Sequence, residues 1–220
     1  MGLIKDLGNL LFPEDLCLFC RDNEGVDKEY ICRSCKEQVE FLHKEVDLDS
    51  PYVEKAYYSV FYNRFLKDHI HDFKYSGKSY LYKAFGHMLL STIAYYNLED
   101  EIHLISYVPM HRRKEALRGY NQARLLAEYL AKELDKPLLK KNLIKIRHTK
   151  DQNKLGKLGR QTNLIDSFKA VDSYQFEGKK ILLIDDIITT GATIRECGKV
   201  LIEKGAREVY GLAITSSKKF

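Results

Sequence analysis

The chain has 220 residues, of which 45% are hydrophobic and 30% are charged, and its formal net charge is +5. A chain of this length forms one or two domains with a sizeable core. No run approaches the roughly 20 apolar residues of a membrane-spanning helix, so we expect no transmembrane segment. The first residues, which include Asp6, fit neither a secretion signal nor a myristoylation site. We therefore expect a cytoplasmic protein.

The positive charge is distributed unevenly along the chain. Residues 1–50 contain 6 Lys and Arg against 12 Asp and Glu, whereas residues 109–163 contain 15 basic and 5 acidic residues. Such a concentration of positive charge suits a polyphosphate or a nucleic acid, and a solvated basic surface is the alternative interpretation.

Two CxxC pairs, Cys17/Cys20 and Cys32/Cys35, lie near the start of the chain. Four thiolates at this spacing predict a small tetrahedral zinc site. Disulfides are the competing interpretation, but they are rare in a reducing compartment. Because all four ligand positions would be filled by sulfur, we expect the zinc to be structural. We assign residues 1–50 to this module, which resembles a double zinc ribbon, and residues 51–220 to a second domain.

The next elements alternate between strand and helix. The sequence predicts a strand over 56–62, helices over 63–74 and 79–96, and a strand over 104–109. A basic loop follows, with Arg112, Arg113 and Arg118, and a helix begins near Asn121. The planar guanidinium groups suit bidentate phosphate contact, so we expect this loop to bind pyrophosphate. Further strands are predicted over 138–146 and 168–171.

The stretch 181–193 carries the strongest signal. Ile181 to Ile184 predict a strand buried on both faces, and Asp185 and Asp186 follow it directly. The loop Thr189-Thr190-Gly191-Ala192-Thr193 then leads into a helix over 194–203. A Thr/Gly loop at a helix N-terminus is an anion site, whereas two carboxylates need other targets, such as ribose hydroxyls or Mg²⁺. The pattern therefore predicts a sugar-phosphate ligand, and the last strand, over 208–215, should lie beside the central one.

This stretch resembles the phosphoribosyltransferase signature for phosphoribosyl pyrophosphate (PRPP): a hydrophobic strand, two acids and a T-x-G-x-T loop. The resemblance implies that Asp185 and Asp186 bind the ribose hydroxyls as catalytic residues, that residues 189–193 bind the 5′-phosphate, and that Mg²⁺ accompanies PRPP. Hypoxanthine-guanine phosphoribosyltransferases have an acid immediately before the T-G of this loop, and here that position is Thr189. Salvage of 6-oxopurines is therefore not expected.

The whole pattern is similar to the ComF family. The segment Val108 to Gln122 matches V-P-x-H-x-R-x(4)-R-G-x-N-Q, and the segment Arg147 to Phe168 contains the further family positions Gln152, Arg160 and Asn163. Both lie between the CxxC pairs and the PRPP loop, in the order of the family. The resemblance implies an α/β fold of the type I phosphoribosyltransferase class, with a central, mostly parallel sheet flanked by helices, behind a zinc finger.

The family resemblance also implies roles for the remaining residues and for the protein. Arg112, Arg113, Arg118 and Asn121 would contact pyrophosphate, while Gln152 and Arg160 would belong to a mobile loop. Family members are implicated in uptake of single-stranded DNA during natural transformation, alongside a helicase-like partner. Two hypotheses follow: an enzyme that transfers a phosphoribosyl group to an unidentified acceptor, or a non-catalytic competence factor that binds single-stranded DNA and uses PRPP as a ligand or regulator.

Overall fold

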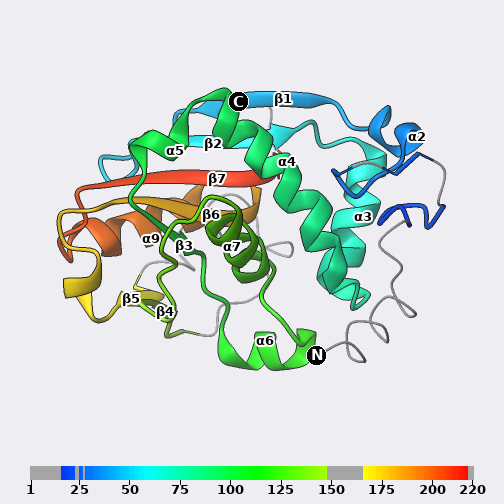
Figure 1. Ribbon diagram of the computed structural model, residues 1–220. Helices are drawn as coiled ribbons and strands as arrows, with labels where there is room; N and C mark the ends of the chain where they lie inside the picture. The colour runs from blue at the N-terminus through cyan, green and yellow to red at the C-terminus, as the bar shows by residue number, and fades with distance from the viewer. Residues whose placement is uncertain (1–15, 23–24, 27, 148–165, 218–220) are drawn as a thin grey trace, which may run out of the picture.

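A five-stranded sheet forms the centre of the molecule (Figure 1). The computed structural model describes residues 16–22, 25–26, 28–147 and 166–217. The strand order is β1-β2-β7-β6-β3. All neighbours are parallel except β1, which is antiparallel to β2 at one edge. The strands are β1 (Phe41–Val46), β2 (Lys55–Val60), β3 (Leu104–Tyr107), β6 (Lys180–Ile188) and β7 (Glu208–Ser216).

Helices cover both faces of this sheet. The described helices are α2 (Arg33–Lys36), α3 (Arg64–Tyr75), η1 (Ser79–Leu81), α4 (Tyr82–Tyr95), α5 (Leu98–Glu101), α6 (Arg112–Arg118), α7 (Gln122–Glu133), η3 (Ser173–Gln175) and α9 (Ala192–Ile202). Helices α4 and α7 pack on one face and α9 packs on the other. A separate two-stranded sheet of β4 (Leu143–Lys145) and β5 (Phe168–Ala170) lies against α9.

The alternation of side chains along β6 explains this layered arrangement. Leu182 and Ile184 enter the core on the side of α4 and α7, while Ile181 and Leu183 enter the core on the side of α9. All four are fully buried. A run of four apolar residues is what a parallel strand covered on both faces requires.

The predicted fold class is confirmed: the central sheet is mostly parallel and flanked by helices. The last strand, β7, pairs with β6 as predicted. The basic stretch after β3, predicted as a loop, instead contains helix α6. Its N-cap is His111, whose Nδ1 accepts the Arg113 N–H at 3.3 Å, and its C-cap is Gly119, whose φ is 88°. A positive φ is a common helix terminator that glycine adopts without strain.

The division of the chain at residue 50 stays a prediction. The strand β1 precedes this point and β2 follows it, and the two pair with each other at the edge of the central sheet. The segment before residue 50 also contributes to the main hydrophobic core. The ring centroid of Phe19 lies 5.4 Å from that of Phe65 and 5.6 Å from that of Phe85.

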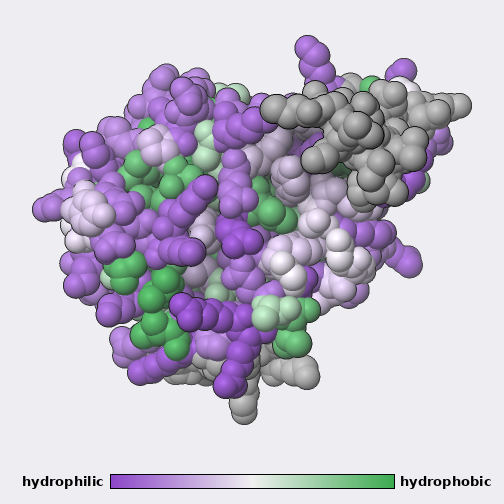
Figure 2. Space-filling model, turned by 60° about the horizontal axis from the view of Figure 1, so that its bottom comes forward, coloured by the Kyte–Doolittle hydropathy of each residue, from purple (hydrophilic) through white to green (hydrophobic). Residues whose placement is uncertain are grey.

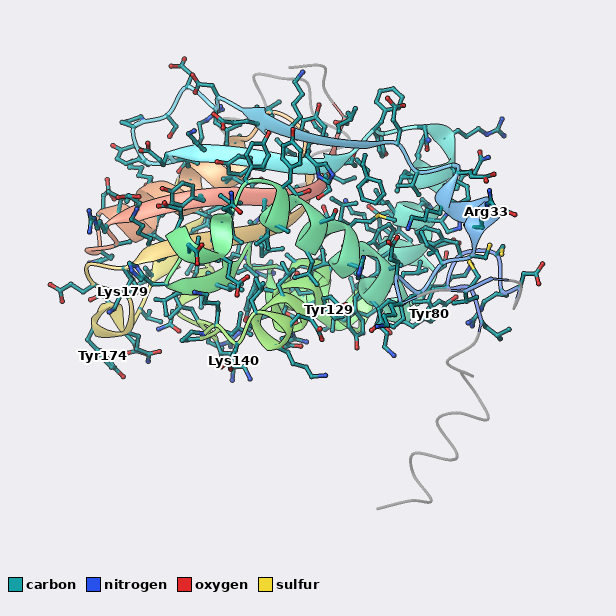
Figure 3. All side chains as sticks on the ribbon, turned by 45° about the horizontal axis from the view of Figure 1, so that its top comes forward. Arg33, Tyr80, Tyr129, Lys140, Tyr174 and Lys179 are labelled. Atoms are coloured by element: carbon teal, nitrogen blue, oxygen red, sulfur yellow. The ribbon has the colours of Figure 1, made fainter. Side chains whose placement is uncertain are left out.

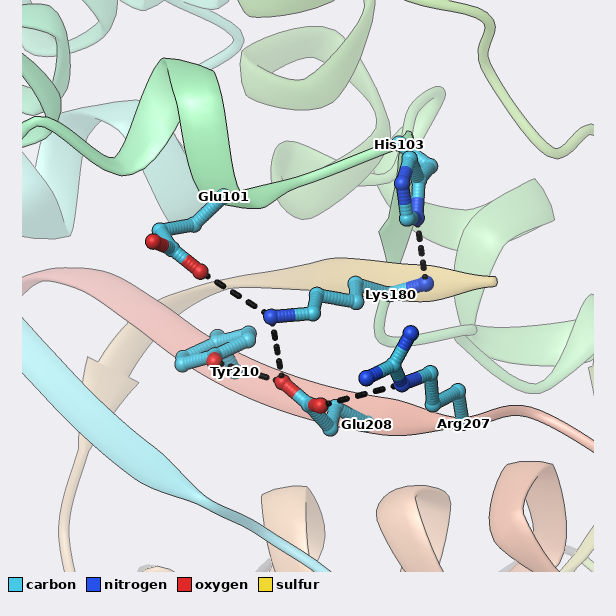
Figure 4. Close-up of polar contacts among 6 residues, drawn as sticks. All are labelled: Glu101, His103, Lys180, Arg207, Glu208 and Tyr210. Atoms are coloured by element: carbon cyan, nitrogen blue, oxygen red, sulfur yellow. Dashed lines mark hydrogen bonds and ion pairs between the residues drawn. The ribbon is translucent and has the colours of Figure 1, made fainter. Parts of the chain in front are cut away.

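An ion-pair network lies at the amino-terminal end of β6 (Figure 4). The Lys180 ammonium is 3.0 Å from both Glu101 and Glu208, and Arg207 also contacts Glu208 at 3.4 Å. The backbone N–H of Lys180 donates to His103 Nδ1 at 3.0 Å. These contacts connect α5, β6 and β7 at the end of the sheet where the parallel strands begin.

The surface in Figure 2 is largely hydrophilic, with small separate hydrophobic areas. Large apolar side chains are mostly buried, and those that are exposed, such as Leu117 and Tyr174, are scattered among the elements. Figure 3 shows Tyr174 at the periphery, pointing outward. Among the described residues, no helix combines the length and the apolar character that crossing a membrane requires.

Candidate functional site

The carboxyl end of β6 brings acids and a Thr/Gly loop to one edge of the sheet. Asp185 and Asp186 are partly buried near the end of the strand, and α9 begins at Ala192. Gly191 precedes α9 with a φ of 71°, and a Cβ at this position would lie 2.6 Å from Leu48 Cδ2. Both the backbone conformation and the close packing therefore favour glycine here.

The loop presents its polar groups at the N-terminus of α9. The Thr190 hydroxyl accepts the Ala192 N–H at 3.4 Å, and Gly191 has no side chain that could cap the helix. The first N–H groups of a helix have no partner within the helix and carry partial positive charge. Together with the hydroxyl groups of Thr189 and Thr193, they are suited to an anion such as phosphate.

The two carboxylates are held by different contacts. Asp185 Oδ1 accepts the backbone N–H of Asp186 at 2.8 Å, and Asp186 Oδ1 lies 2.9 Å from the Lys74 ammonium of α3. Burial and the neighbouring Asp186 carboxylate raise the pKa of Asp185 to about 7. Burial opposes the charged form of Lys74, but Asp186 outweighs it and raises the pKa of that ammonium. Among the described residues, the two acids therefore share one directly paired cation.

A cavity of about 390 Å³ opens above this pair. In the part of the chain that the structure describes, its wall combines the two acids with five cationic side chains and several apolar or aromatic ones. The cationic residues are Lys67, Lys74, Lys114, Arg118 and Lys145. Such a wall suits a ligand that carries several negative charges together with hydroxyl groups.

Most of the predicted ligand-binding residues lie at this cavity. Asp185 and Asp186 line it, as do Thr189, Gly191 and Thr193, whereas Thr190 and Ala192 belong to the same loop but not to the cavity wall. Their contacts with PRPP stay predictions.

The basic residues predicted to contact pyrophosphate occupy three different settings. Arg118 lines the cavity, donates to Gln122 Oε1 at 2.7 Å and lies 4.8 Å from the Tyr75 ring centre. Arg112 and Arg113 are exposed on α6 and do not line the cavity. Asn121 lines it, but its Oδ1 caps α7 and its Nδ2 donates to the Val108 carbonyl at 3.0 Å. These hydrogen bonds give Asn121 a structural role, and pyrophosphate contact by all four residues stays a prediction.

One wall of the cavity was not predicted from the sequence. Helix α3 contributes Lys67, His71, Lys74 and Tyr75 to it. The helix was predicted, and Lys67, His71 and Lys74 are spaced four and three residues apart, which places them on one helical face. That spacing is the signal that could have identified the wall. Gln152 and Arg160, predicted to lie on a mobile loop, fall outside the described residues.

The four cysteines of the two CxxC pairs come together as predicted. Their Sγ atoms all lie within 4.8 Å of one another, and those of Cys20 and Cys32 are 3.6 Å apart. Four sulfurs around one zinc ion at about 2.3 Å are separated by about 3.8 Å, so the cluster fits a tetrahedral metal. Figure 3 shows sulfur atoms gathered beside Arg33.

The environment of this cluster favours a thiolate at Cys17, whereas burial raises the pKa of the Cys20 and Cys35 thiols. Burial opposes the charge on Cys17, yet backbone N–H groups of Cys32, Cys20 and Phe19 lower the pKa of its thiol to about 7. The Asp22 N–H donates to Cys20 Sγ at 3.5 Å. Backbone donors around sulfur ligands are the usual second layer of contacts at a metal site.

Comparisons with known proteins agree with this arrangement. The family model described as phosphoribosyl transferase domain matches residues 121–217. Competence protein F of Haemophilus influenzae is 28% identical over 90% of this chain and 96% of its own length. Competence protein ComFC of Bacillus subtilis is 28% identical over 89% of this chain and 82% of its own. The chain is a homologue of the ComF competence proteins.

A third relative, DNA utilization protein YhgH of Escherichia coli K12, is 29% identical over 64% of this chain and 62% of its own length. Within this ComF homologue, the domain match includes α7, β6, the Thr/Gly loop, α9 and β7. The cysteine cluster and helix α3 lie outside the match. The wall of the cavity that carries Lys74 is therefore a feature that the domain match alone does not describe.

Proposed function

We propose that the cavity binds PRPP and that the protein transfers its phosphoribosyl group to an acceptor. One observation carries this proposal: a carboxylate pair, a Thr/Gly loop at a helix N-terminus and a cluster of cations line a single cavity. Each group matches one part of PRPP, because ribose offers hydroxyl donors while its two phosphorylated ends offer negative charge. The match to a phosphoribosyl transferase domain supports the same ligand.

The residues divide naturally between the parts of the ligand. Asp185 and Asp186 accept hydrogen bonds from the ribose hydroxyls. The loop of Thr189, Thr190, Gly191, Ala192 and Thr193 binds the 5′-phosphate through its N–H and hydroxyl groups. Arg118, with Arg112, Arg113 and Asn121 from the same stretch, is the proposed contact for pyrophosphate.

The site also fits Mg²⁺ that arrives with the ligand. Mg²⁺ usually binds through substrate phosphate oxygens and water, together with one or two carboxylates, rather than in a dedicated protein cage. A cavity lined by two carboxylates together with several cationic side chains accommodates such a complex. When bound, Mg²⁺ would neutralise part of the charge on the departing pyrophosphate.

The chemistry asks for positioning and electrostatics rather than covalent catalysis by the protein. As pyrophosphate leaves C1′, positive charge develops on the ribose ring and negative charge on the leaving group. The acid pair stabilises the former and the basic residues stabilise the latter. Because Thr189 replaces the acid that serves purine substrates in related enzymes, we propose an acceptor other than a 6-oxopurine.

Thermal unfolding tests the proposed ligand. At a hundredfold excess of PRPP over its Kd, binding stabilises the folded state by about 2.7 kcal/mol. For a chain of this size, that corresponds to a rise in melting temperature of roughly 5–10 °C. We expect the rise to require Mg²⁺ and to vanish in the double variant Asp185→Ala/Asp186→Ala.

A matched control lies at the opposite end of the same strand. The double variant Glu101→Ala/Glu208→Ala also removes two carboxylates near β6, but far from the cavity. It should keep the full ligand-induced rise. If the aspartate variant keeps the rise, or the glutamate variant loses it, the site assignment is wrong.

A second candidate function is a competence factor without catalysis that binds single-stranded DNA. The excess of basic residues over 109–163 and the names of the relatives favour contact with DNA, and a helicase-like protein is the proposed partner. Incubation with PRPP and a panel of nucleobases, nucleic acids and cell extract separates the two candidates. Pyrophosphate release selects the enzyme, whereas salt-sensitive DNA binding without release selects the second candidate.

We further propose that the cysteine cluster binds one structural Zn²⁺. Cys17, Cys20, Cys32 and Cys35 supply four sulfurs, so no coordination position is left for water. Phe19 lies within the first CxxC pair and contacts Phe65 and Phe85 of the main core. The ion would therefore stabilise the packing of this segment on α3 and α4.

Metal analysis and chelation test this assignment. We expect one zinc ion per chain in the purified protein, and we expect chelation to lower the melting temperature of the whole chain because the segment shares its core. Protein that contains no zinc as purified, and whose unfolding is insensitive to chelators, would refute the assignment.

A further inference from the structure

Lys74 lies where helix α3 meets the acid pair. Its ammonium is 2.9 Å from Asp186 Oδ1, and the two side chains are only 19% and 15% exposed. Among the described residues it is the cation that pairs with either aspartate within 4.0 Å. Loss of one partner from a partly buried pair of this kind costs more than loss of one partner from a surface pair, because the remaining charge is left uncompensated.

The contact orients Asp186 without occupying all of its acceptor positions. An ionised carboxylate offers about four acceptor positions on two oxygens. The Lys74 ammonium contacts Asp186 Oδ1, and the Asp186 backbone N–H donates to Asp185 Oδ1. Each aspartate is therefore fixed through one oxygen, and both side chains still line the cavity.

The helix that carries Lys74 is itself held firmly. Asn63 caps its start by accepting the Leu66 N–H at 2.9 Å, and Leu66 and Phe73 are fully buried. The Phe73 carbonyl, one residue before Lys74, accepts hydrogen bonds from Tyr120 Oη at 2.7 Å and Gln122 Nε2 at 2.9 Å. A side chain on a packed helix is positioned more accurately than one on a loop.

The hydrogen bond from Gln122 also connects α3 with Arg118 at the end of α6. Gln122 donates to the Phe73 carbonyl and accepts from Arg118 Nη1 at 2.7 Å. The end of α3 thus contacts the acid pair through Lys74 and the proposed pyrophosphate residue Arg118 through Gln122. The C-terminal end of α3 therefore contacts both the acid pair and the basic residue Arg118 of the cavity.

We propose that Lys74 is a positioning residue of this site, which acts through Asp186 to fix the carboxylate pair for the ribose hydroxyls of PRPP. The inference rests on the proposed function. It extends the ligand site to α3, outside the matched phosphoribosyl transferase domain. Removal of Lys74 leaves two adjacent, partly buried carboxylates without their paired cation, and these repel each other and the anionic ligand.

A double-mutant cycle tests this role, with the Kd for PRPP and Mg²⁺ measured by calorimetry. Loss of one partner of a buried charge pair typically costs 2 kcal/mol or more, so Lys74→Met should weaken binding about 30-fold or more. In the Asp186→Asn background, the same substitution should change affinity less than about twofold, because its target is already neutral. Lys74→Arg, which keeps the charge, should restore most of the affinity.

Lys67→Met is the matched control. Lys67 lies on the same face of α3 and lines the same cavity, but it is exposed and makes no ion pair with the aspartates. The change in PRPP affinity caused by Lys67→Met should be the same whether residue 186 is Asp or Asn. Where Lys74→Met does not fold, Lys74→Gln replaces it, since an amide keeps a hydrogen-bond donor.

The possible outcomes separate this inference from the proposed function. Equal losses from Lys74→Met in both backgrounds, or no loss in either, overturn the positioning role while PRPP binding by the wild-type protein stands. A wild-type protein that does not bind PRPP overturns the proposed function, and this inference with it.

Discussion

Acidic side chains lie at both ends of strand β6, but the two ends differ in how many cations pair with them. At the amino-terminal end, Glu101 and Glu208 are matched by Lys180 and Arg207, and the glutamates are 54% and 24% exposed. At the carboxyl end, Asp185 and Asp186 are more buried, and Lys74 alone pairs with them among the described residues. Among the described residues, the acids at one end are each held in direct ion pairs, whereas the two acids at the other end have one direct ion pair between them.

The difference distinguishes a structural network from a ligand site. Balanced charges near the surface connect neighbouring elements and contribute little to stability. Adjacent, partly buried carboxylates with a single directly paired cation destabilise the folded protein, and such an arrangement is characteristic of sites where a ligand supplies the missing hydrogen-bond partners. At the carboxyl end of β6, that ligand would supply hydroxyl donors for the acids.

The largest effect is expected from the pH dependence of stability in Asp185→Asn. The pKa of Asp185 is about 7 in the folded protein, because of burial and Asp186, and about 3.9 in the unfolded chain. The protonated carboxyl therefore favours folding, and this contribution is lost as the pH rises from about 4 to about 7. Asparagine imitates the protonated form, so the variant should be more stable than wild type by roughly 2–4 kcal/mol at pH 8 and equal to it near pH 4.

Glu208→Gln should change stability in the opposite direction, as measured by denaturation over the same pH range. Hydrogen bonds from Tyr210 and Lys180 lower the pKa of Glu208. Its charge therefore stabilises the folded state above the unfolded pKa, and this stability is lost as the pH falls through the folded value. Neutral glutamine should reduce stability at pH 8. If both variants change stability in the same direction at this pH, the two ends of β6 do not differ as described.

The carboxyl end of β6 could be predicted because its features are local in the sequence. Four apolar residues, two acids, two further isoleucines and a Thr/Gly loop follow one another from Ile181 to Thr193. The strand and the turn at Gly191 each have a local cause, namely the apolar run and the positive φ that glycine permits. The four cysteines were predictable for the same reason, because each CxxC turn brings two sulfurs together.

Contacts between distant segments could not be predicted in this way. Lys74 reads as one more basic residue at the end of a helix, and only the packing of α3 beside the end of β6 places it against Asp186. Similarly, Arg112, Arg113 and Arg118 form one basic stretch in the sequence, but helix α6 directs Arg118 alone of the three to the cavity. Composition indicated the charge of the site, whereas tertiary packing selected the residues that form it.

The smallest effect is expected from Lys180→Met at the amino-terminal end. The substitution removes the ammonium between Glu101 and Glu208, while Arg207 still contacts Glu208. The melting temperature should fall slightly at low ionic strength, and the difference should shrink at high salt because exposed charges are screened. The rise in melting temperature caused by PRPP with Mg²⁺ should equal that of the wild type. A reduced rise would mean that the two ends of β6 are coupled, and the distinction between a structural end and a ligand-binding end would no longer hold.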